Sequence, residues 1–521
     1  MPAYAYNGRH RITYPSPTRS FADMFPALHQ INTRVMLAEL SGELGRPATL
    51  DDIGDDLLDG FALWGFDFIW LMGVWQTGEA GRNISRTNAE WRAGYRADLP
   101  DLHERDIVGS PFAIKAYSVH ADFGGNEALI RLRERMKQRG LRLILDFVPN
   151  HTALDHAWVN EHPEYYIEGT EADIKREPRN YLRVAGAGGM RVLAYGRDPY
   201  FPGWVDTFQL NYRHAGLRAA MIGELLKIAE LCDGVRCDMA MLVLSNVFAR
   251  TWGERSLPRD GGLPADSPFW PEAIGKVRAL TSGFVFLSEV YWDLEAALQA
   301  QGFDYTYDKS YYDRLRHGDA RPVREHLKAD LEFQSRSARF LENHDEVRAA
   351  TAFAAEKYQA AAVLTYTVPG MRFFQDGQFD GRRKHSNIHL GRRADESPDP
   401  LMRDFYGRLL PVLRKPELRE GHWRLLEQTP AWPDNPTWQN YITYEWRGGD
   451  RQRMWIVVNF GATAGQCYVH FGDDSLRGVP FLLRDQMSRA WYQRDGSELD
   501  EKGLYVDLPA WGYYVFDVVA T

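Results

Sequence analysis

The chain has 521 residues and a formal net charge of −9, and one large α/β barrel with insertions and a small appended domain would use that length. Acidic residues outnumber basic ones, and the sequence has no long basic run, so it lacks the electrostatic footprint of a nucleic-acid-binding protein. The most apolar run, residues 61–75, contains Asp67 and is too short to cross a bilayer as a helix. We therefore expect neither nucleic acid nor a membrane as a partner.

The chain start and the cysteines bear on the compartment. Residues 1–7 lack the basic start and apolar stretch of a secretory signal. Only Cys232, Cys237 and Cys467 occur, and this small, odd number argues against a disulfide framework. We expect a cytoplasmic protein. Cys232 and Cys237 bracket a predicted buried strand, which favours core packing over metal binding.

Short β-type runs alternate with helical patterns over most of the chain, which is typical of parallel βα units. The run 143–148 is a compact apolar strand, and Leu129, Leu132 and Met136 precede it at helical spacing, with Gly140 as the stop. The expected barrel strands, in chain order, are residues 34–37, 67–72, 143–148, 234–238, 284–289, 303–307, 340–343 and 363–367.

The spacing of these units predicts three domains. More than sixty residues separate Val148 from the helix near Gly216, too many for an ordinary βα loop, so an inserted subdomain is expected there. After about residue 415, β-rich runs at 454–458, 467–470 and 511–516 replace the helical period. The fold class is thus a (β/α)8 TIM barrel (1–150 and 206–415) with a small inserted domain after strand 3 (151–205) and a C-terminal antiparallel β-sandwich domain (416–521).

Four polar clusters lie at or just beyond the ends of predicted barrel strands, where this architecture places active sites. A single carboxylate at a strand end is often only a solvated end or a helix cap. Four clusters in order, by contrast, bring several carboxylates and two histidines to one barrel mouth. The clusters are residues 146–151, 233–238, 286–290 and 340–345.

These clusters resemble, in order, the first four sequence regions of the α-amylase superfamily, glycoside hydrolase family thirteen. Residues 207–211 resemble the region at the end of that family's inserted domain, and the resemblance extends from residues 31–34 to the C-terminal domain. It implies a retaining α-glucan-active enzyme with Asp238 as nucleophile, Glu289 as acid/base and Asp345 as the carboxylate that grips sugar hydroxyls.

The chemistry supports these implied roles. Retention needs two carboxyl groups about 5 Å apart, and crowding by Asp238 and Asp345 in a partly dry pocket would raise the pKa of Glu289. Arg236 projects from the same face of its strand as Asp238 and would orient it and keep it ionised.

Further residues are assigned from the resemblance. His151 and His344 would donate hydrogen bonds to the sugar, and Asp146 would be a structural acceptor. Phe112 stands where the family has a tyrosine that stacks on the sugar, with core packing as the competing interpretation. Trp75, Trp204 and Trp292 would offer flat rings to sugar faces, although tryptophan is also a common core residue.

The calcium ligands of the family are altered. Met241 and Leu242 replace a Lys-His pair whose His carbonyl ligates calcium, and Gln209 replaces an acidic ligand, although Asn150 remains. Calcium needs hard oxygen ligands and usually carboxylate charge. We expect no required metal or other cofactor, with calcium optional.

The leading hypothesis is hydrolysis of α-1,4-linked glucans or malto-oligosaccharides. The alternative within the superfamily is transglycosylation or isomerisation through the same covalent intermediate, as in glucanotransferases or trehalose-forming relatives. A third hypothesis is that the chain is a non-catalytic carbohydrate-binding or transporter-associated relative. The presence of Asp238, Glu289 and Asp345 argues against it, because such relatives typically lose a carboxylate.

Overall fold

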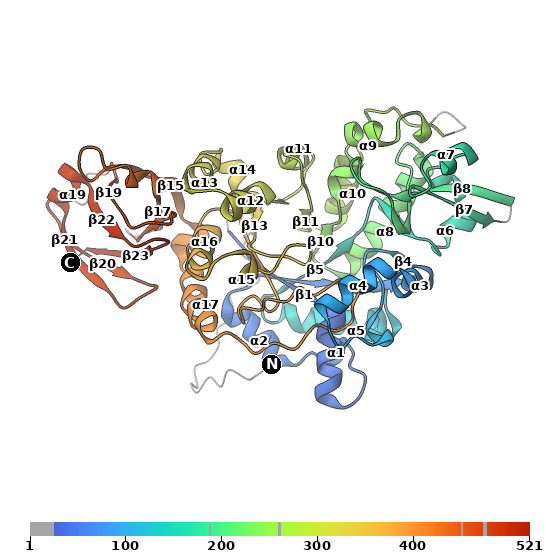
Figure 1. Cartoon of the computed structure of the whole chain (residues 1–521), viewed down its shortest axis with the longest axis horizontal. Helices are drawn as coiled ribbons and strands as arrows, with labels where there is room; N and C mark the ends of the chain where they lie inside the picture. Colours follow the sequence, from blue (N-terminus) through green and yellow to red (C-terminus); the bar gives the residue numbers. More distant parts are fainter. Residues whose placement is uncertain (1–24, 187–188, 259–261, 450–451, 473–476, 521) are drawn as a thin grey trace.

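The computed structural model describes residues 25–186, 189–258, 262–449, 452–472 and 477–520, so the first seven residues, on which the expectation about a secretory signal depends, lie outside it. Within these ranges the centre is a closed barrel of eight strands (Figure 1). The strands pair in parallel and follow one another around the barrel in chain order. They are β1 (Ala27–Asn32), β2 (Phe68–Met72), β5 (Arg142–Phe147), β10 (Gly234–Cys237), β11 (Val285–Ser288), β12 (Tyr305–Tyr307), β13 (Ser337–Arg339) and β14 (Met371–Gln375).

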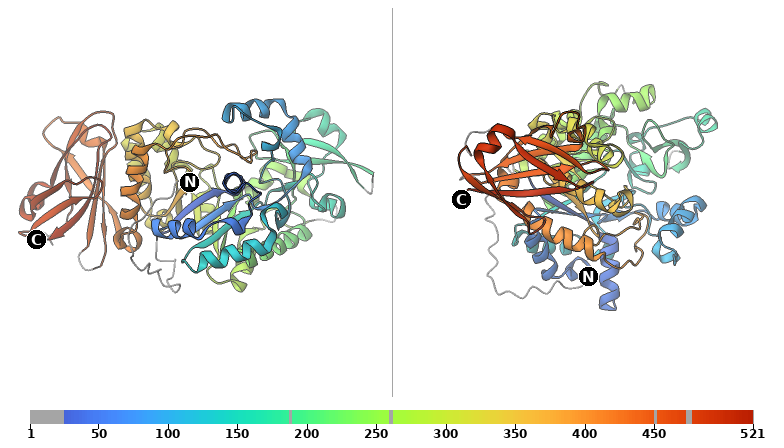
Figure 2. Two further views of the ribbon diagram at one scale, coloured as in Figure 1. Left: turned by 90° about the horizontal axis from the view of Figure 1, so that it is seen from below. Right: turned by 60° about the vertical axis from the view of Figure 1, so that its left-hand side comes forward.

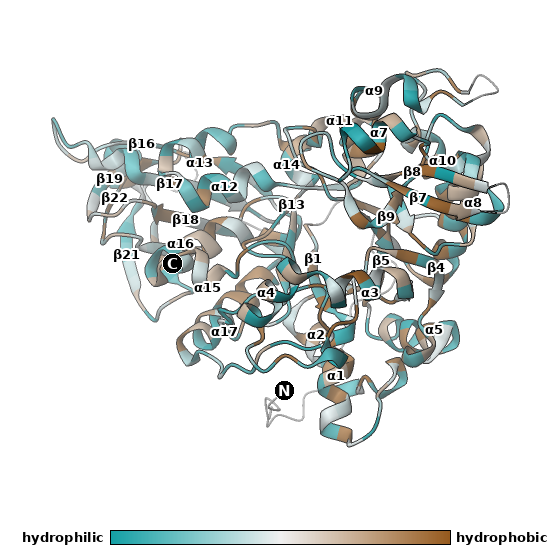
Figure 3. Ribbon diagram, turned by 45° about the vertical axis from the view of Figure 1, so that its right-hand side comes forward, coloured by the Kyte–Doolittle hydropathy of each residue, from teal (hydrophilic) through white to brown (hydrophobic). Residues whose placement is uncertain are grey.

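Helices surround this barrel (Figure 1), where an amphipathic helix buries its apolar face. In α8, Leu217, Met221, Leu225 and Ile228 are all buried, as their spacing predicts. In Figure 3 the central strand β5 is largely hydrophobic, whereas the outer helix α13 is largely hydrophilic. The principal helices are α1 (Thr33–Leu44), α2 (Asp55–Trp64), α5 (Gly125–Lys137), α8 (Ala215–Leu231), α10 (Trp270–Leu280), α11 (Glu295–Ala300), α12 (Lys309–His317), α13 (Ala320–His326), α14 (Leu331–Ser335), α16 (Ala355–Tyr366) and α17 (Pro400–Leu413).

The first barrel strand lies earlier than predicted. Residues 34–37 belong to helix α1, which begins where the Asn32 side chain accepts a hydrogen bond from the backbone N–H of Val35. The strand is β1, whose His29 and Gln30 side chains are buried although they are polar. These two residues interrupt the apolar pattern that marks a buried strand.

The seventh and eighth strands also differ from prediction. Residues 340–343 follow β13 rather than form it, and residues 363–367 lie at the end of helix α16, not in a strand. All residues from Ala360 to Tyr366 are buried, because α16 packs against α17 and against strand β18 of the C-terminal domain. A helix buried on all sides shows the same continuous apolar run as a buried strand.

Two insertions extend the carboxyl end of the barrel. After β2 come the paired strands β3 (Trp75–Thr77) and β4 (Ile114–Val119), with α3 (Glu79–Thr87) and α4 (Ala89–Asp98) between them. After β5 comes a four-stranded sheet in the order β6-β9-β8-β7. Its strands are β6 (His151–Ala153), β7 (Tyr181–Gly186), β8 (Gly189–Gly196) and β9 (Trp204–Gln209).

The C-terminal part is two antiparallel sheets, as predicted. A six-stranded sheet, β15-β17-β18-β23-β20-β21, faces a three-stranded sheet, β16-β19-β22. Apolar residues of both sheets form one core, among them Trp455, Val469 and Val506. The strands are β15 (His422–Leu425), β16 (Glu427–Pro430), β17 (Tyr441–Arg447), β18 (Arg453–Asn459), β19 (Gly465–His470), β20 (Pro480–Asp485), β21 (Trp491–Asp495), β22 (Leu504–Leu508) and β23 (Tyr513–Ala520).

The C-terminal sheets and the inserted strands β7 and β8 lie at opposite ends of the long axis (Figures 1 and 2). The C-terminal sheets are tied to the barrel through Thr367, whose carbonyl accepts from Trp446 Nε1 at 2.6 Å. We propose the barrel, insertion and C-terminal domain bounds stated above; β9 begins at Trp204, just before the proposed boundary after residue 205.

Candidate active site

The centre of the site is the guanidinium of Arg236, on barrel strand β10. Its Nη1 lies 2.6 Å from Oδ1 of Asp238, and its Nη2 lies 2.7 Å from Oε2 of Glu289. Arg236 and Asp238 are two residues apart, so their side chains point to the same face of the chain, and Glu289 follows the neighbouring strand β11. The structure therefore brings the two residues predicted as nucleophile and acid/base onto one cation.

Backbone contacts fix the two loops that carry these carboxylates. The backbone N–H of Glu289 donates to the Cys237 carbonyl at 3.0 Å, and the N–H of Met239 donates to Glu289 Oε2 at 2.6 Å. Met239 has a φ of 43°, in the left-handed region that a non-glycine residue adopts at a cost. Trp292 and Asp293, just after Glu289, also have a positive φ. Three residues with an unfavourable backbone conformation therefore lie close to the two carboxylates in the sequence.

The surroundings of Glu289 favour a protonated carboxyl. Burial raises its pKa; Arg236 acts in the opposite direction, and the nearby charges of Asp238 and Asp345 raise it further. The net result is a pKa well above the usual glutamate value. Tyr291 donates its hydroxyl to Glu289 Oε1 at 2.9 Å and so holds the side chain in place.

Asp345 and His344 lie on the loop after β13. The Asp345 side chain is 41% exposed, in contrast to the buried Asp238 and Glu289. The His344 ring is buried, and burial lowers its pKa well below the usual value, so it is neutral. Gln30 Nε2 lies 2.7 Å from His344 Nδ1; since an amide nitrogen donates, Nδ1 accepts and Nε2 carries the hydrogen. That Nε2 lies 3.2 Å from Asp345 Oδ2.

His151 is the first residue of β6 and is also buried and neutral. Burial lowers its pKa, although Asp238 and the Phe112 backbone act in the opposite direction. Its Nδ1 lies 3.4 Å from Asn150 Nδ2, so here too an amide N–H faces Nδ1. Trp204 lies beside it, with ring centroids 5.2 Å apart.

Aromatic rings enclose the Arg236 guanidinium. Its central carbon lies 5.1 Å from the Phe112 ring, 5.2 Å from the Trp70 ring and 5.8 Å from the Tyr307 ring. Tyr307 also accepts from Arg236 Nε at 3.3 Å. Phe112 is thus part of the site, since its ring also lies 5.3 Å from that of His344.

Trp75, predicted either to contact substrate or to pack in the core, is a core residue in the structure. Its side chain is completely buried, and its Nε1 donates to the backbone carbonyl of Asp146 at 2.7 Å. The core interpretation of Trp75 is therefore the correct one. Asp146 is a structural acceptor, as expected, with Trp70 Nε1 at 3.0 Å and the Gly73 N–H at 2.7 Å; burial raises its pKa to about 6.

Sequence reasoning missed four residues of the site. Gln30 was missed because strand β1 was misplaced, and Tyr307 because one tyrosine on a strand carries no distinctive signal. Met239 acts through its backbone, which leaves no mark in the sequence. Tyr291 lies two residues after Glu289, and that spacing was a usable signal.

The place of the family's calcium does not suit a cation. Gln209 is fully buried, and its Nε2 lies 2.9 Å from Asn150 Oδ1, 3.0 Å from the Asn150 carbonyl and 3.1 Å from the Leu210 carbonyl. Oxygens that would ligate calcium instead accept hydrogen bonds from this amide. Met241, in the place of the family's lysine, is also fully buried. Among the described residues, no group of three or more His, Cys, Asp or Glu side chains could hold a metal ion.

The (β/α)8 barrel holds this pair of buried carboxylates at its carboxyl end, where barrel enzymes place their active sites. Comparison with known proteins gives the family. Residues 112–389, more than half of the chain, match the model "Alpha amylase, catalytic domain". The chain belongs to the α-amylase family of glycoside hydrolases and is an enzyme of that family.

Named relatives are distant. The chain is 25% identical over 308 residues to α-amylase MalA of Haloarcula japonica (56% of this chain, 39% of the relative). It is 30% identical over 198 residues to an α-1,4-glucan:maltose-1-phosphate maltosyltransferase of Cereibacter sphaeroides (36% and 31%). In both cases the match spans less than half of the relative's length.

Solved structures share the fold. The maltogenic α-amylase AmyB of Thermotoga neapolitana superposes with a TM-score of 0.66 at 17% identity, over 95% of this chain and 98% of AmyB. In the described part of the chain, no helix is long and apolar enough to span a membrane.

The Gln209 geometry predicts stability without divalent cations. Excess EDTA should leave the Tm of the protein unchanged, because Gln209 already satisfies the oxygens that calcium would bind. Gln209→Asp should destabilise the apo protein by roughly 1–3 kcal/mol, since it removes buried donors, and calcium should restore part of the loss. Differential scanning calorimetry checks both.

Gln209→Leu is the matched control, with a lowered Tm that calcium does not change. A clear fall in the Tm of the unaltered protein in EDTA would contradict this interpretation.

Proposed function

We propose that this chain is a retaining α-glycosidase that hydrolyses α-glucosidic bonds, mainly α-1,4, in glucans or malto-oligosaccharides. The observation that carries the proposal is the contact of Arg236 with both carboxylates, at 2.6 Å to Asp238 and 2.7 Å to Glu289. Two carboxylates on one guanidinium are close neighbours. Retention requires a short separation of about 5 Å, whereas inversion needs a wider gap for water.

The first step forms a covalent intermediate. Asp238 attacks the anomeric carbon as Glu289 gives its proton to the glycosidic oxygen, so the C–O bond breaks and the leaving sugar departs as an alcohol. In the second step Glu289, now ionised, takes a proton from water, and the water oxygen displaces Asp238 from the anomeric carbon. Asp238 and Glu289 return to their starting states, and the anomeric configuration is retained.

Other residues would bind the sugar. Asp345, the exposed carboxylate, would accept hydrogen bonds from sugar hydroxyls. His344 and His151, both neutral with Nδ1 facing an amide donor, would present Nε2–H as donors. Phe112 and Trp204 would contact the sugar with their rings.

Calcium is optional in this proposal, and no step depends on it. The maltosyltransferase among the relatives keeps a second outcome open, in which a sugar hydroxyl replaces water at the intermediate. Asp238 and Glu289 would have the same roles in that transfer reaction.

The test is time-resolved proton NMR of the purified chain with maltoheptaose. We expect shorter maltosaccharides released first as the α-anomer. Glu289→Gln should lower turnover by about 10²–10⁴-fold, because it cannot donate the proton. Glu295→Gln, which alters a buried glutamate in α11, is the matched control and should keep turnover.

Two outcomes would contradict the hydrolase proposal. β-Anomeric products would exclude retention, and products longer than maltoheptaose would show that transfer dominates. Full activity in Glu289→Gln would remove the acid/base assignment itself.

The raised pKa of Glu289 predicts a pH profile. The group must be protonated to act as an acid, so kcat/KM should fall as pH rises through its pKa, on a limb well above the usual glutamate value of 4.5. Tyr291→Phe should move this limb to higher pH, because the phenol donates to the charged carboxylate and its loss disfavours that form.

Tyr305→Phe is the control, since Tyr305 is buried on β12 and should leave the limb in place. An unshifted limb in Tyr291→Phe, with reduced activity alone, would mean that Tyr291 only packs.

A further inference from the structure

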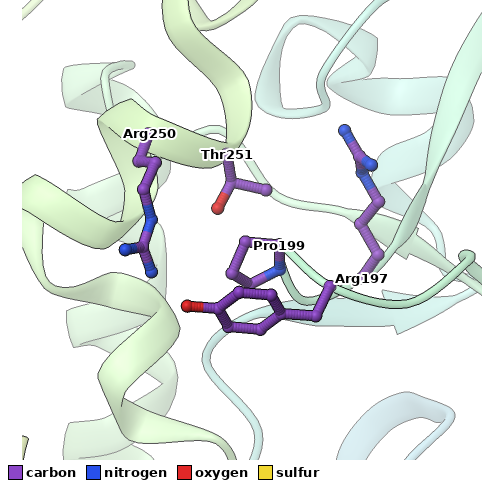
Figure 4. Close-up of a pocket in the computed structure, with 5 residues that line it drawn as sticks. Arg197, Pro199, Arg250 and Thr251 are labelled. Carbon is purple, nitrogen blue, oxygen red and sulfur yellow. The ribbon is translucent and has the colours of Figure 1, made fainter. Parts of the chain in front are cut away.

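A pocket separate from the residues around Arg236 lies beside the loop that carries Glu289. It has a volume of about 280 Å³ and is lined by Arg197, Pro199, Tyr200, Arg250 and Thr251. Figure 4 shows the Arg197 and Arg250 side chains on opposite sides of Pro199 and Thr251. None of these residues belongs to the constellation around Arg236.

Two structural elements form this pocket. Arg197, Pro199 and Tyr200 come from the loop between β8 and β9, which is held by Asp198: its Oδ1 accepts from the Tyr200 N–H at 2.6 Å and the Phe201 N–H at 2.9 Å. Arg250 and Thr251 come from α9 (Ser245–Trp252), after the strand that carries Arg236. The pocket thus joins the insertion to the loop after β10.

The pocket adjoins the side of the site where the leaving group departs. The Tyr200 ring meets the Trp292 ring edge-on, with centroids 4.9 Å apart, and Trp292 follows Glu289 by three residues. An acid that protonates the leaving oxygen lies on the leaving-group side of the cleaved bond. A group in this pocket would therefore be attached to the leaving or accepting sugar.

The two arginines lack carboxylate partners. Among the described residues, neither guanidinium makes an ion pair or a hydrogen bond, and Arg197 Nε is buried without a partner. By contrast, the buried Arg339 pairs with Asp308 at 3.0 Å. A buried N–H without an acceptor costs free energy, so an acceptor from outside the chain would stabilise Arg197, whereas Arg250 is exposed and available to the same acceptor.

Aromatic rings hold both guanidinium groups. Arg197 lies over Trp252, with its central carbon 4.9 Å from the ring, and Arg250 lies over Tyr200 at 5.6 Å. Stacking leaves the N–H edges of a guanidinium free for a planar acceptor. The pKa of Glu177 is lowered first by its hydrogen bond with Asn180 and further by the charge of Arg197, and its two oxygens accept from Asn180 and Arg176.

We propose that this pocket binds the phosphate of a phosphorylated sugar that occupies the leaving-group or acceptor position. Two arginines suit the charge and the several acceptor oxygens of a phosphate ester, and the exposed Tyr200 ring offers a face to the attached sugar. The proposal rests on the proposed function, because it assumes a sugar bond cleaved or formed at Glu289.

The test measures binding rather than turnover, so that it is separate from the test of the hydrolase proposal. Isothermal titration of the full chain at low salt compares glucose 6-phosphate, glucose and inorganic phosphate. Glucose 6-phosphate should bind more tightly than either of the other two. The double variant Arg197→Gln, Arg250→Gln should weaken it by about tenfold or more, and added salt should weaken binding to the unaltered protein.

Two control variants complete the design. Arg489→Gln removes one positive charge from an exposed residue of the C-terminal domain and should leave binding unchanged. Glu289→Gln should keep glucose 6-phosphate binding while turnover falls, which distinguishes failure of the pocket from failure of the catalytic assignment.

Three results would overturn the proposal. These are equal affinity for glucose and glucose 6-phosphate, binding of inorganic phosphate as tight as that of the sugar phosphate, and glucose 6-phosphate binding that survives the double variant. A circular dichroism spectrum and Tm of the double variant close to those of the unaltered protein would show that its loss of binding is not unfolding.

Discussion

The contact of Arg236 with two carboxylates is the interaction on which the site depends. The guanidinium is fully buried, and a buried cation is tolerated only when anions pair with it. Asp238 and Glu289 contact it directly, and Asp146 is close enough to raise its pKa. One positive charge thus faces three buried carboxyl groups, which cannot all stay ionised in a medium of low polarity. Burial raises the pKa of Asp146 and of Glu289. Burial, to which the charges of Asp238 and Asp345 add, is therefore what favours a proton on Glu289, the proposed general acid.

The barrel makes this arrangement rigid. Strands β5, β10 and β11 pair in register, so Asp146, Arg236 and Leu287 lie side by side and the residues that follow them end at one mouth. Three rings around the guanidinium exclude water, and exclusion of water strengthens each ion pair. The strained turn at Met239 places its N–H on Glu289 Oε2. The unfavourable backbone conformation of Met239 thus helps to position the Glu289 carboxylate.

A site residue could be predicted from the sequence where it lies in, or at the end of, a segment with a clear periodic or apolar pattern. Arg236 and Asp238 could be placed because alternate residues of a strand share a face, and Glu289 because it ends a clear apolar run. Gln30 could not be placed, because a polar residue inside the barrel erases the apolar pattern that identifies its strand. Residues 363–367 looked like a strand because the second half of helix α16, from Ala360 to Tyr366, is buried on all sides. For Trp75 the sequence left sugar contact and core packing both open, because its position after β2 does not fix the direction of its ring, whose Nε1 donates to the Asp146 carbonyl.

Carboxamide side chains link the two histidines of the site to the rest of the fold. Gln30 sets the hydrogen on Nε2 of His344, and Asn150 faces Nδ1 of His151 in the same way. Asn150 is itself held by Gln209, whose Oε1 accepts from Asn150 Nδ2 at 3.1 Å and whose Nε2 donates back to it. The Gln209 amide therefore donates hydrogen bonds to the surrounding oxygens and also accepts one from Asn150. A metal cation could not accept that hydrogen bond. In the place of the family's acidic calcium ligand, the Gln209 amide therefore orients Asn150, the neighbour of His151. The backbone N–H of Arg197 also donates to Gln209 Oε1, at 3.4 Å. The buried Gln209 side chain, through Asn150, therefore connects His151 to the loop that lines the pocket between Arg197 and Arg250.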